Sequence, residues 1–185
     1  MKLTFNSLYL LVCGIFLLYL TLPAPPFPQK PYESLQSVEE WDTESPFKRG
    51  YMTNFSRKQV IDLYYNQMNM VGKVALPTIR LNYPPEDAQT LIRDQTRSSY
   101  LEEFVHPFRE SLFVNGYIPE KDVYEIWYRG LKFDQKVVIK YSLSNLYTRS
   151  ILFIIAAGVF YFILLELISV TKALFKEWVL TRLHG

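Results

Sequence analysis

The sequence predicts an α+β extracytoplasmic domain, with helices first and an antiparallel sheet after them, flanked by two transmembrane helices. Two observations predict the flanking helices: residues 3–22 contain no charged residue, and residues 151–170 contain only Glu166. About 20 apolar residues at 1.5 Å each span the ~30 Å hydrocarbon core of a bilayer. The third observation predicts the domain, because charged residues and amphipathic patterns fill the segment between the two runs.

The first apolar run, assigned to residues 1–23, is expected to be an uncleaved signal anchor. Cleavage of a signal peptide favours small residues at the −3 and −1 positions, whereas Leu20 and Leu22 close this run and Pro25 would follow a cut after Ala24. Removal as a signal peptide is the alternative. Cys13, the single cysteine, lies in mid-run, so the domain has no intrachain disulfide.

The charges beside the two runs predict the orientation. Lys2 precedes the first run, and Lys172, Lys176 and Arg182 outnumber Glu177 after the second. Both flanks are therefore positive, and the positive-inside rule places both termini in the cytoplasm. Residues 24–148 hold 15 basic and 16 acidic residues, a net charge of −1, and we expect them on the opposite side. Arg149, at the outer end of the second run, is an exception to the rule.

The segment after the first run divides into a linker and a domain. Residues 24–55, which begin with a proline-rich stretch, are expected to form a polar linker, and residues 56–148 the α+β domain. Ser56 is a predicted N-cap for an amphipathic helix over 56–71. A second helix is predicted after Pro84, and it would place Arg93 and Arg97 on one face because they are four residues apart.

The β-forming residues lie between residue 100 and residue 143. Asn115 and Gly116 stand between short apolar runs, which predicts a type I′ hairpin turn, because both residue types tolerate positive φ. Residues 122–143 alternate between apolar or aromatic and charged side chains, and residues 129–135 are a possible second hairpin connection. The sheet is therefore predicted to be antiparallel, with one face in water.

The second span is assigned to residues 149–171 and a cytoplasmic amphipathic tail to 172–185. Ala157 and Gly158 would give this span a narrow face for packing against the first span or another chain. A carboxylate within a membrane is often functional, but Glu166 lies within reach of the cytoplasmic interface. We therefore expect these residues to make intramembrane contacts rather than to conduct ions.

The stretch that is richest in reactive groups, residues 98–117, contains Glu102, Glu103, His106, Arg109 and Glu110. It matches no catalytic motif. His106 and His184 are the two histidines and fall on opposite sides of the predicted membrane, so no two-histidine metal site forms in one chain. Glu102 and Glu103 are adjacent and would point to opposite faces of a strand, which does not suit a two-carboxylate hydrolase. We expect neither a metal nor a cofactor.

Two hypotheses follow for function. In the first, the domain is a protein-interaction or assembly module of an envelope complex, with the lipid bilayer, other membrane proteins or further copies of the chain as partners. In the second, it is a membrane-tethered enzyme or a lipid- or small-ligand-binding domain with a cleft between helices and sheet. Either surface would use Arg93, Arg97, His106 and Arg109. Nucleic acid is excluded as a partner, because 20 basic residues interleave with 18 acidic ones and form no basic cluster.

Overall fold

The structure is a computed structural model that describes residues 2–71, 74–120 and 124–184, with the side chains of 4–71, 74–120 and 124–176. The chain divides into two compact units. A helical unit comprises residues 1–21 and 145–185, and a domain comprises residues 22–144. Together they make an α+β chain with an antiparallel sheet and two helices that are long and apolar enough to span a membrane.

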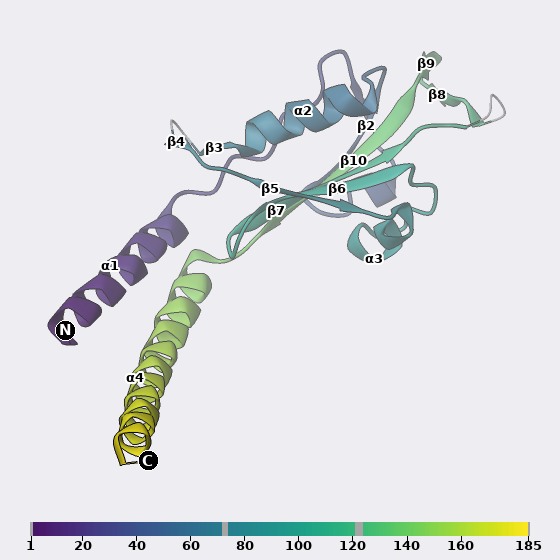
Figure 1. The fold of residues 1–185 in the computed structure, drawn as a ribbon. Coiled ribbons are helices and arrows are strands. Elements are labelled where there is room, and N and C mark those ends of the chain that lie inside the picture. Colours follow the sequence, from purple (N-terminus) through teal and green to yellow (C-terminus); the bar gives the residue numbers. More distant parts are fainter. Residues whose placement is uncertain (1, 72–73, 121–123, 185) are drawn as a thin grey trace. The chain divides into compact units, whose positions relative to one another are not determined.

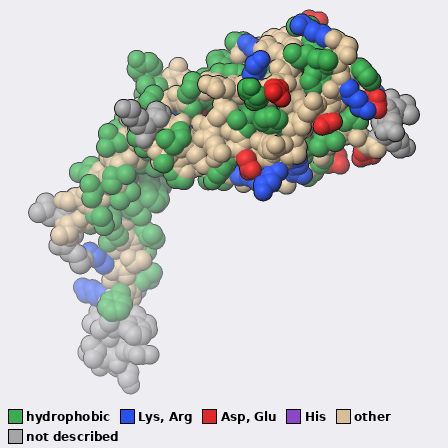
Figure 2. Space-filling view, turned by 90° about the horizontal axis from the view of Figure 1, so that it is seen from above, with side chains coloured by type: hydrophobic (Ala, Val, Ile, Leu, Met, Phe, Trp, Pro, Cys, Tyr) green, Lys and Arg blue, Asp and Glu red, His purple; other side chains and the backbone are tan. Residues whose placement is uncertain are grey.

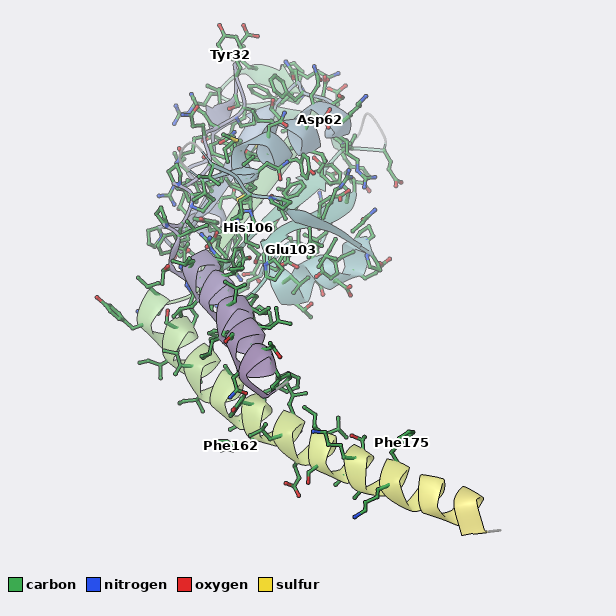
Figure 3. The ribbon with its side chains drawn as sticks, turned by 60° about the vertical axis from the view of Figure 1, so that its left-hand side comes forward. Tyr32, Asp62, Glu103, His106, Phe162 and Phe175 are labelled. Atoms are coloured by element: carbon green, nitrogen blue, oxygen red, sulfur yellow. The ribbon has the colours of Figure 1, made fainter. Side chains whose placement is uncertain are left out.

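The helical unit consists of α1 (Lys2–Thr21) and α4 (Leu146–His184). The two helices are antiparallel, since Phe16 contacts Phe153, with ring centroids 4.9 Å apart, while Tyr9 contacts Tyr161, which lies further along α4. The Tyr9 hydroxyl donates to the Ala157 carbonyl at 2.5 Å. Many apolar side chains of both helices are exposed, Figure 2 shows apolar surface on one face of the molecule, and Phe162 and Phe175 project outward from α4 (Figure 3). Such exposure of apolar side chains suits lipid better than water.

Helix α4 differs in length from the predicted second span. It runs without a break for 39 residues, or about 58 Å at 1.5 Å per residue, so no boundary separates a span at 149–171 from a tail at 172–185. The amphipathic arrangement predicted for the tail depends on side chains beyond residue 176, which lie outside the described residues.

The domain is built on a six-stranded antiparallel sheet in the order β1-β2-β10-β7-β6-β5. The strands of this sheet are β1 (Leu35–Gln36), β2 (Lys48–Thr53), β5 (Ile79–Tyr83), β6 (Tyr100–His106), β7 (Glu110–Tyr117) and β10 (Gln135–Leu143). Two small hairpins, β3 (Met70–Val71) with β4 (Val74–Ala75) and β8 (Ile126–Tyr128) with β9 (Leu131–Phe133), extend from it. A short 3-10 helix, η1 (Glu40–Asp42), precedes β2.

Helix α2 (Arg57–Met68) covers one face of the sheet, as Figure 1 shows. Ser56 is its N-cap, as predicted, and the cap is reciprocal: the Ser56 hydroxyl accepts from the Gln59 backbone, and the Gln59 side chain accepts from the Ser56 backbone. The helix buries an apolar stripe against alternate residues of the central strands. The buried members are Tyr51, Val60, Ile61, Tyr64, Met68, Tyr100, Phe104, Leu112, Val114, Val137, Ile139 and Tyr141.

The other face of the sheet is covered over part of its area by the one-turn helix α3 (Ala88–Leu91), which follows the 3-10 turn η2 (Pro85–Asp87). Ala88 and Ile92 pack on Leu101 there. Two lysines from the sheet satisfy carbonyls at the end of α3: Lys140 Nζ donates to Leu91 O at 2.9 Å, and Lys48 Nζ to Arg93 O at 3.2 Å. Cations at a helix C-terminus are favourable, which explains two lysines on this face.

The predicted hairpin turn at Asn115 and Gly116 is wrong. Both residues lie inside β7 and pair with β6 on one side and with β10 on the other. Glycine at position 116 instead leaves room for the ring of Tyr100, its partner in β6, which a Cβ at this position would overlap. The β6–β7 connection lies at Pro107–Phe108–Arg109, and Phe108 has the positive φ of 64°.

The second predicted hairpin connection, at residues 129–135, is confirmed in part. Arg129 and Gly130, with φ of 51° and 78°, form the two-residue turn between β8 and β9. The alternating run was predicted from residue 122, and its first two positions fall outside the described residues.

The predicted boundary between linker and domain also differs from the structure. Residues 48–53 form β2, which is an interior strand between β1 and β10, and the domain begins at Leu22. The sequence of residues 32–55 is mostly polar and did not predict this strand, because β2 is the one regular element there with more than three residues. The helix predicted after Pro84 is also shorter than expected, since α3 ends at Leu91 and Asp94 has a φ of 65°.

Candidate functional site

A cluster of polar side chains lies beneath the β6–β7 connection, and we call it the turn cluster: Thr78, His106, Arg109 and Glu110. It joins residues from the start of β5, the end of β6 and the start of β7. The side chains of His106, Arg109 and Glu110 are completely enclosed. His106 Nδ1 lies 2.8 Å from Glu110 Oε1, and Arg109 Nη2 lies 3.0 Å from the same oxygen. The buried charges are therefore paired, as burial demands.

Three residues of the turn cluster are hydrogen-bonded in the series carboxylate, histidine and hydroxyl, which is the arrangement of a catalytic triad. Glu110 accepts from His106 Nδ1, and His106 Nε2 lies 3.2 Å from the Thr78 hydroxyl. A nucleophile must also face a space that admits a substrate. The Thr78 side chain is buried, and two pockets in the described part of the domain lie elsewhere, one beside Ile118 and Asp134 and the other beside Pro85 and Ser98. The arrangement therefore orients buried groups and is not an open active site.

Arg109 connects the turn cluster to both ends of the domain. Its Nη2 donates to the Pro23 carbonyl at 2.9 Å, and its own carbonyl accepts from the Ser144 backbone at 2.9 Å. Tyr141 also helps to hold the segment around Pro23, because its hydroxyl donates to the Pro25 carbonyl at 2.8 Å. The point where the chain enters the domain and the point where it leaves are thus fixed beside each other.

Glu102 and Glu103 point to opposite faces of β6, as predicted. Glu102 lies under α2, where Arg57 Nη2 and Arg80 Nε each approach its carboxylate to 2.7 Å. Glu103 lies on the α3 face and accepts from the Tyr83 hydroxyl at 2.6 Å, which raises the pKa of Tyr83 to about 12. Figure 3 labels Glu103 and His106. The two carboxylates are separated by the sheet and cannot act on one substrate.

The pKa of Glu102 lies below its ordinary value. Burial alone would raise that pKa, since it penalises the charged form, but the hydrogen bonds from Arg80 and Arg57 outweigh it. Arg57 also lies over the ring of Tyr100, 4.9 Å from its centroid. Neither arginine was singled out from the sequence, because their link to Glu102 spans 45 and 22 positions along the chain.

The four residues predicted to form a ligand-binding or partner-binding surface do not lie together in the structure. Arg93 and Arg97 precede β6, whereas His106 ends it and Arg109 follows, about 20 Å away along the strand. Arg93 pairs with Asp94 at 3.2 Å, and Arg97 lies over the ring of Tyr124. Both are exposed, but the side chains of His106 and Arg109 are enclosed and form no part of an exposed surface. The prediction that Arg93 and Arg97 share one face of a helix was also wrong, since α3 ends before them.

The described surface offers a different binding feature, the outer edge of the sheet at β5. This strand pairs with β6 and has no second neighbour among the strands of the described sheet. Ile79 and Leu81 are 49% and 39% exposed, and they lie on the same face of the strand. Thr78 holds the start of the strand, because its backbone donates to Asn69 Oδ1 at 3.1 Å and its hydroxyl contacts His106. An exposed edge strand with apolar side chains is a template for another strand.

The residues predicted to make intramembrane contacts divide into two groups. Ala157 and Gly158 face α1, where they line a groove of about 460 Å³ together with Cys13 and Gly14. Glu166 is exposed on α4. The narrow face expected at Ala157 and Gly158 is therefore turned toward α1 in the helical unit.

Among the described side chains of residues 4–71, 74–120 and 124–176, no group of three or more His, Cys, Asp or Glu is arranged to hold a metal ion. The space between α2 and the sheet is filled by buried side chains such as Tyr64, Met68 and Phe104. That packing leaves the predicted helix–sheet cleft without a structural basis in the described part of the domain.

The chain matches no known family model, and it has no significant match among curated proteins or solved structures. Inferences about its function therefore rest on its own residues.

Proposed function

We propose that the chain is a two-pass membrane protein whose extracytoplasmic domain binds an extended strand of a partner protein along β5. The domain would act as an interaction or assembly module in an envelope complex. The observation that carries this proposal is the exposed edge of the sheet at β5, with Ile79 and Leu81 on its surface. Strand addition supplies main-chain hydrogen bonds for affinity, and side-chain pockets on alternate positions supply specificity.

The membrane part of the proposal is supported by the helical unit and by the domain, each taken alone. Helices α1 and α4 are apolar and antiparallel, so two spans built this way start and finish on the same side of a bilayer. In the domain, Arg109 holds Pro23 and Ser144 together, so both connections to the helices leave from one place. Positive flanks at the far ends of both helices favour the cytoplasm for those ends.

Photocrosslinking in native membranes tests the proposed interaction. A photoreactive phenylalanine analogue replaces Leu81 on β5, and in a matched control it replaces Leu131 on β9, which is 56% exposed. We expect a discrete adduct from position 81 and none of the same mass from position 131. Adding Ile79→Lys to the first variant should abolish the adduct, because a lysine on an edge strand opposes strand pairing.

Two results would contradict the edge-strand proposal. One is the same set of adducts from positions 81 and 131, which would mean that the analogue captures whatever protein is near. The other is an adduct from position 81 that survives Ile79→Lys, which would mean that the contact does not use the edge. An adduct with twice the mass of the chain would identify the partner strand as β5 of a second copy.

A further inference from the structure

Phe108 is an exposed aromatic residue in an unusual backbone conformation. Its side chain is 75% exposed, at the tip of the β6–β7 connection, and its φ is 64°. A bulky residue rarely adopts positive φ, and where one does, the outlier supports a functional hypothesis. Glycine or asparagine would suit this position better if the turn had only to connect two strands.

The backbone that carries Phe108 is held firmly on both sides. The Arg109 backbone donates to the His106 carbonyl at 3.0 Å, which closes the turn. The Ser144 hydroxyl donates to the Arg109 carbonyl and lies 3.3 Å from the Phe108 carbonyl. Beneath the turn, the enclosed side chains of Arg109 and Glu110 anchor it to the domain. The turn therefore presents Phe108 in one fixed position.

The tip is apolar although the sequence around it is highly charged. The side chains of His106, Arg109 and Glu110 turn inward and pair with one another. Leu143, which is opposite Glu110 in the β7–β10 register, is 45% exposed at the same end of the sheet. This end of the domain thus exposes a phenylalanine and a leucine, while the side chains of His106, Arg109 and Glu110 are buried.

Phe108 lies close to the two points where the chain connects the domain to α1 and α4. Arg109, the next residue, binds Pro23 and Ser144. Pro23 is two residues from Thr21, the end of α1, and Ser144 is two residues from Leu146, the start of α4. Two residues span at most about 7 Å. Phe108 is therefore carried by the end of the domain to which both membrane-length helices are attached.

We infer that Phe108 inserts into the boundary between headgroups and acyl chains of the bilayer that α1 and α4 cross. This inference rests on the proposed membrane topology and adds a lipid-binding contact to it. Aromatic and apolar side chains are favoured at that depth, and the absence of exposed charge from His106, Arg109 and Glu110 removes the penalty of bringing charge to the acyl chains. A phenylalanine at this tip would fix the height and tilt of the domain above the membrane.

Tryptophan fluorescence tests the depth of residue 108 in the full chain. The native tryptophans at 41, 127 and 178 are replaced by phenylalanine, and Phe108→Trp then supplies a single reporter. A second protein keeps only Trp127, which is 62% exposed on β8 at the opposite end of the sheet. A third carries Phe160→Trp in α4, which reports insertion of the helix. Each is reconstituted into phosphatidylcholine–phosphatidylglycerol vesicles whose acyl chains are unmodified, brominated next to the headgroup, or brominated near the chain end, because residue 160 is expected near the bilayer centre and residue 108 near the headgroups.

We expect brominated lipid to quench the reporters at 108 and 160 and to leave Trp127 unchanged. The emission of the reporter at 108 should also shift to shorter wavelength than that of Trp127. If the reporter at 160 is quenched but the reporter at 108 behaves like Trp127, the inference about Phe108 is wrong, whereas the proposed membrane topology still stands. A reporter at 108 shielded from aqueous acrylamide but not quenched by brominated lipid would mean that the tip packs against protein, which also overturns it. Absence of quenching at 160 would contradict the membrane assignment itself, and the inference with it.

Discussion

The turn cluster and the edge strand β5 lie next to each other in the domain but use their residues in opposite ways. The turn cluster contains most of the reactive groups of its region, and it encloses them in mutual contacts. β5 has the sequence IRLNY, which contains no catalytic motif, yet four of its five residues are exposed and its outer edge has no strand partner in the described sheet. Chemical reactivity in the sequence therefore does not locate the surface on which this domain would bind.

Burial explains the difference. A charged group enclosed by protein is tolerated only when other protein groups pair with it, so its bonding capacity is used inside the domain. An edge strand retains backbone donors and acceptors that can bond to another chain. We therefore expect substitutions in the turn cluster to change stability, whereas substitutions of the exposed apolar residues Ile79 and Leu81 on β5 should change binding.

The largest effect is expected from Glu110→Ala. This change leaves the Arg109 guanidinium and His106 enclosed without their shared carboxylate, so the free energy of unfolding should fall by about 3–5 kcal/mol. Chemical denaturation of the full chain in detergent micelles, followed by circular dichroism, measures it. Glu86→Ala, at an exposed position, is the matched control and should change stability by less than about 0.5 kcal/mol. Equal stability of the two variants would mean that the cluster does not hold the domain together.

An intermediate, pH-dependent effect is expected from Glu102→Gln. Because Arg80 and Arg57 hold the pKa of Glu102 below its unfolded value, the unfolded chain binds more protons as the pH falls. The stabilisation from Glu102 is therefore fully present above the unfolded pKa of about 4.3 and is lost as the pH falls through the lower folded pKa. At neutral pH the variant should lose about 1.5–3 kcal/mol of unfolding free energy, the worth of hydrogen bonds to a charged group.

The control for that prediction is Glu103→Gln, which changes the neighbouring carboxylate on the other face of β6. Its partner is the neutral Tyr83 hydroxyl rather than two arginines, so we expect a smaller loss. Denaturation midpoints measured from pH 7 down to about pH 3 should converge for the wild type and Glu102→Gln. A constant difference between them across that range would contradict the proposed role of the Glu102 charge.

Local signals in the sequence were sufficient for some of these elements and not for others. The Ser56 cap and the opposed directions of Glu102 and Glu103 follow from spacing within a few residues, and both were predicted correctly. Asn115 and Gly116 have the local composition of a turn, but pairing with strands on both sides and the ring of Tyr100 determine their conformation. A tertiary contact outweighed local propensity at that position.

The parts that the sequence did not reveal depend on residues far apart in the chain. Arg109 meets Pro23 across 86 positions, and β2 pairs with β10 after more than 80 residues. Nothing in the local composition of residues 24–55 indicates that partner strand, so the segment was predicted to be a linker. The edge position of β5 was missed for the same reason, because which strand is outermost depends on the order of the whole sheet.

The smallest effect on stability is expected from Leu81→Lys. Leu81 is partly exposed on an edge strand, so the unfolding free energy should change by less than about 0.5 kcal/mol. Binding should nevertheless be lost, and coprecipitation of the partner captured from position 81 measures that loss. Lys132→Ala, on the exposed face of β9, is the control and should keep the partner. Retained binding by Leu81→Lys would show that the partner contacts another surface.

In the proposed topology, the domain and the far ends of both helices lie on opposite sides of one membrane. Cysteine accessibility tests this topology, in a Cys13→Ser background that removes the single native cysteine. Cysteines are then introduced singly at Lys132, which is exposed in the domain, and in short tags at the two termini. With a membrane-impermeant maleimide, we expect position 132 to be labelled in intact cells. Both tags should be labelled only after the cells are permeabilised. Labelling of either tag together with position 132 in intact cells would contradict it.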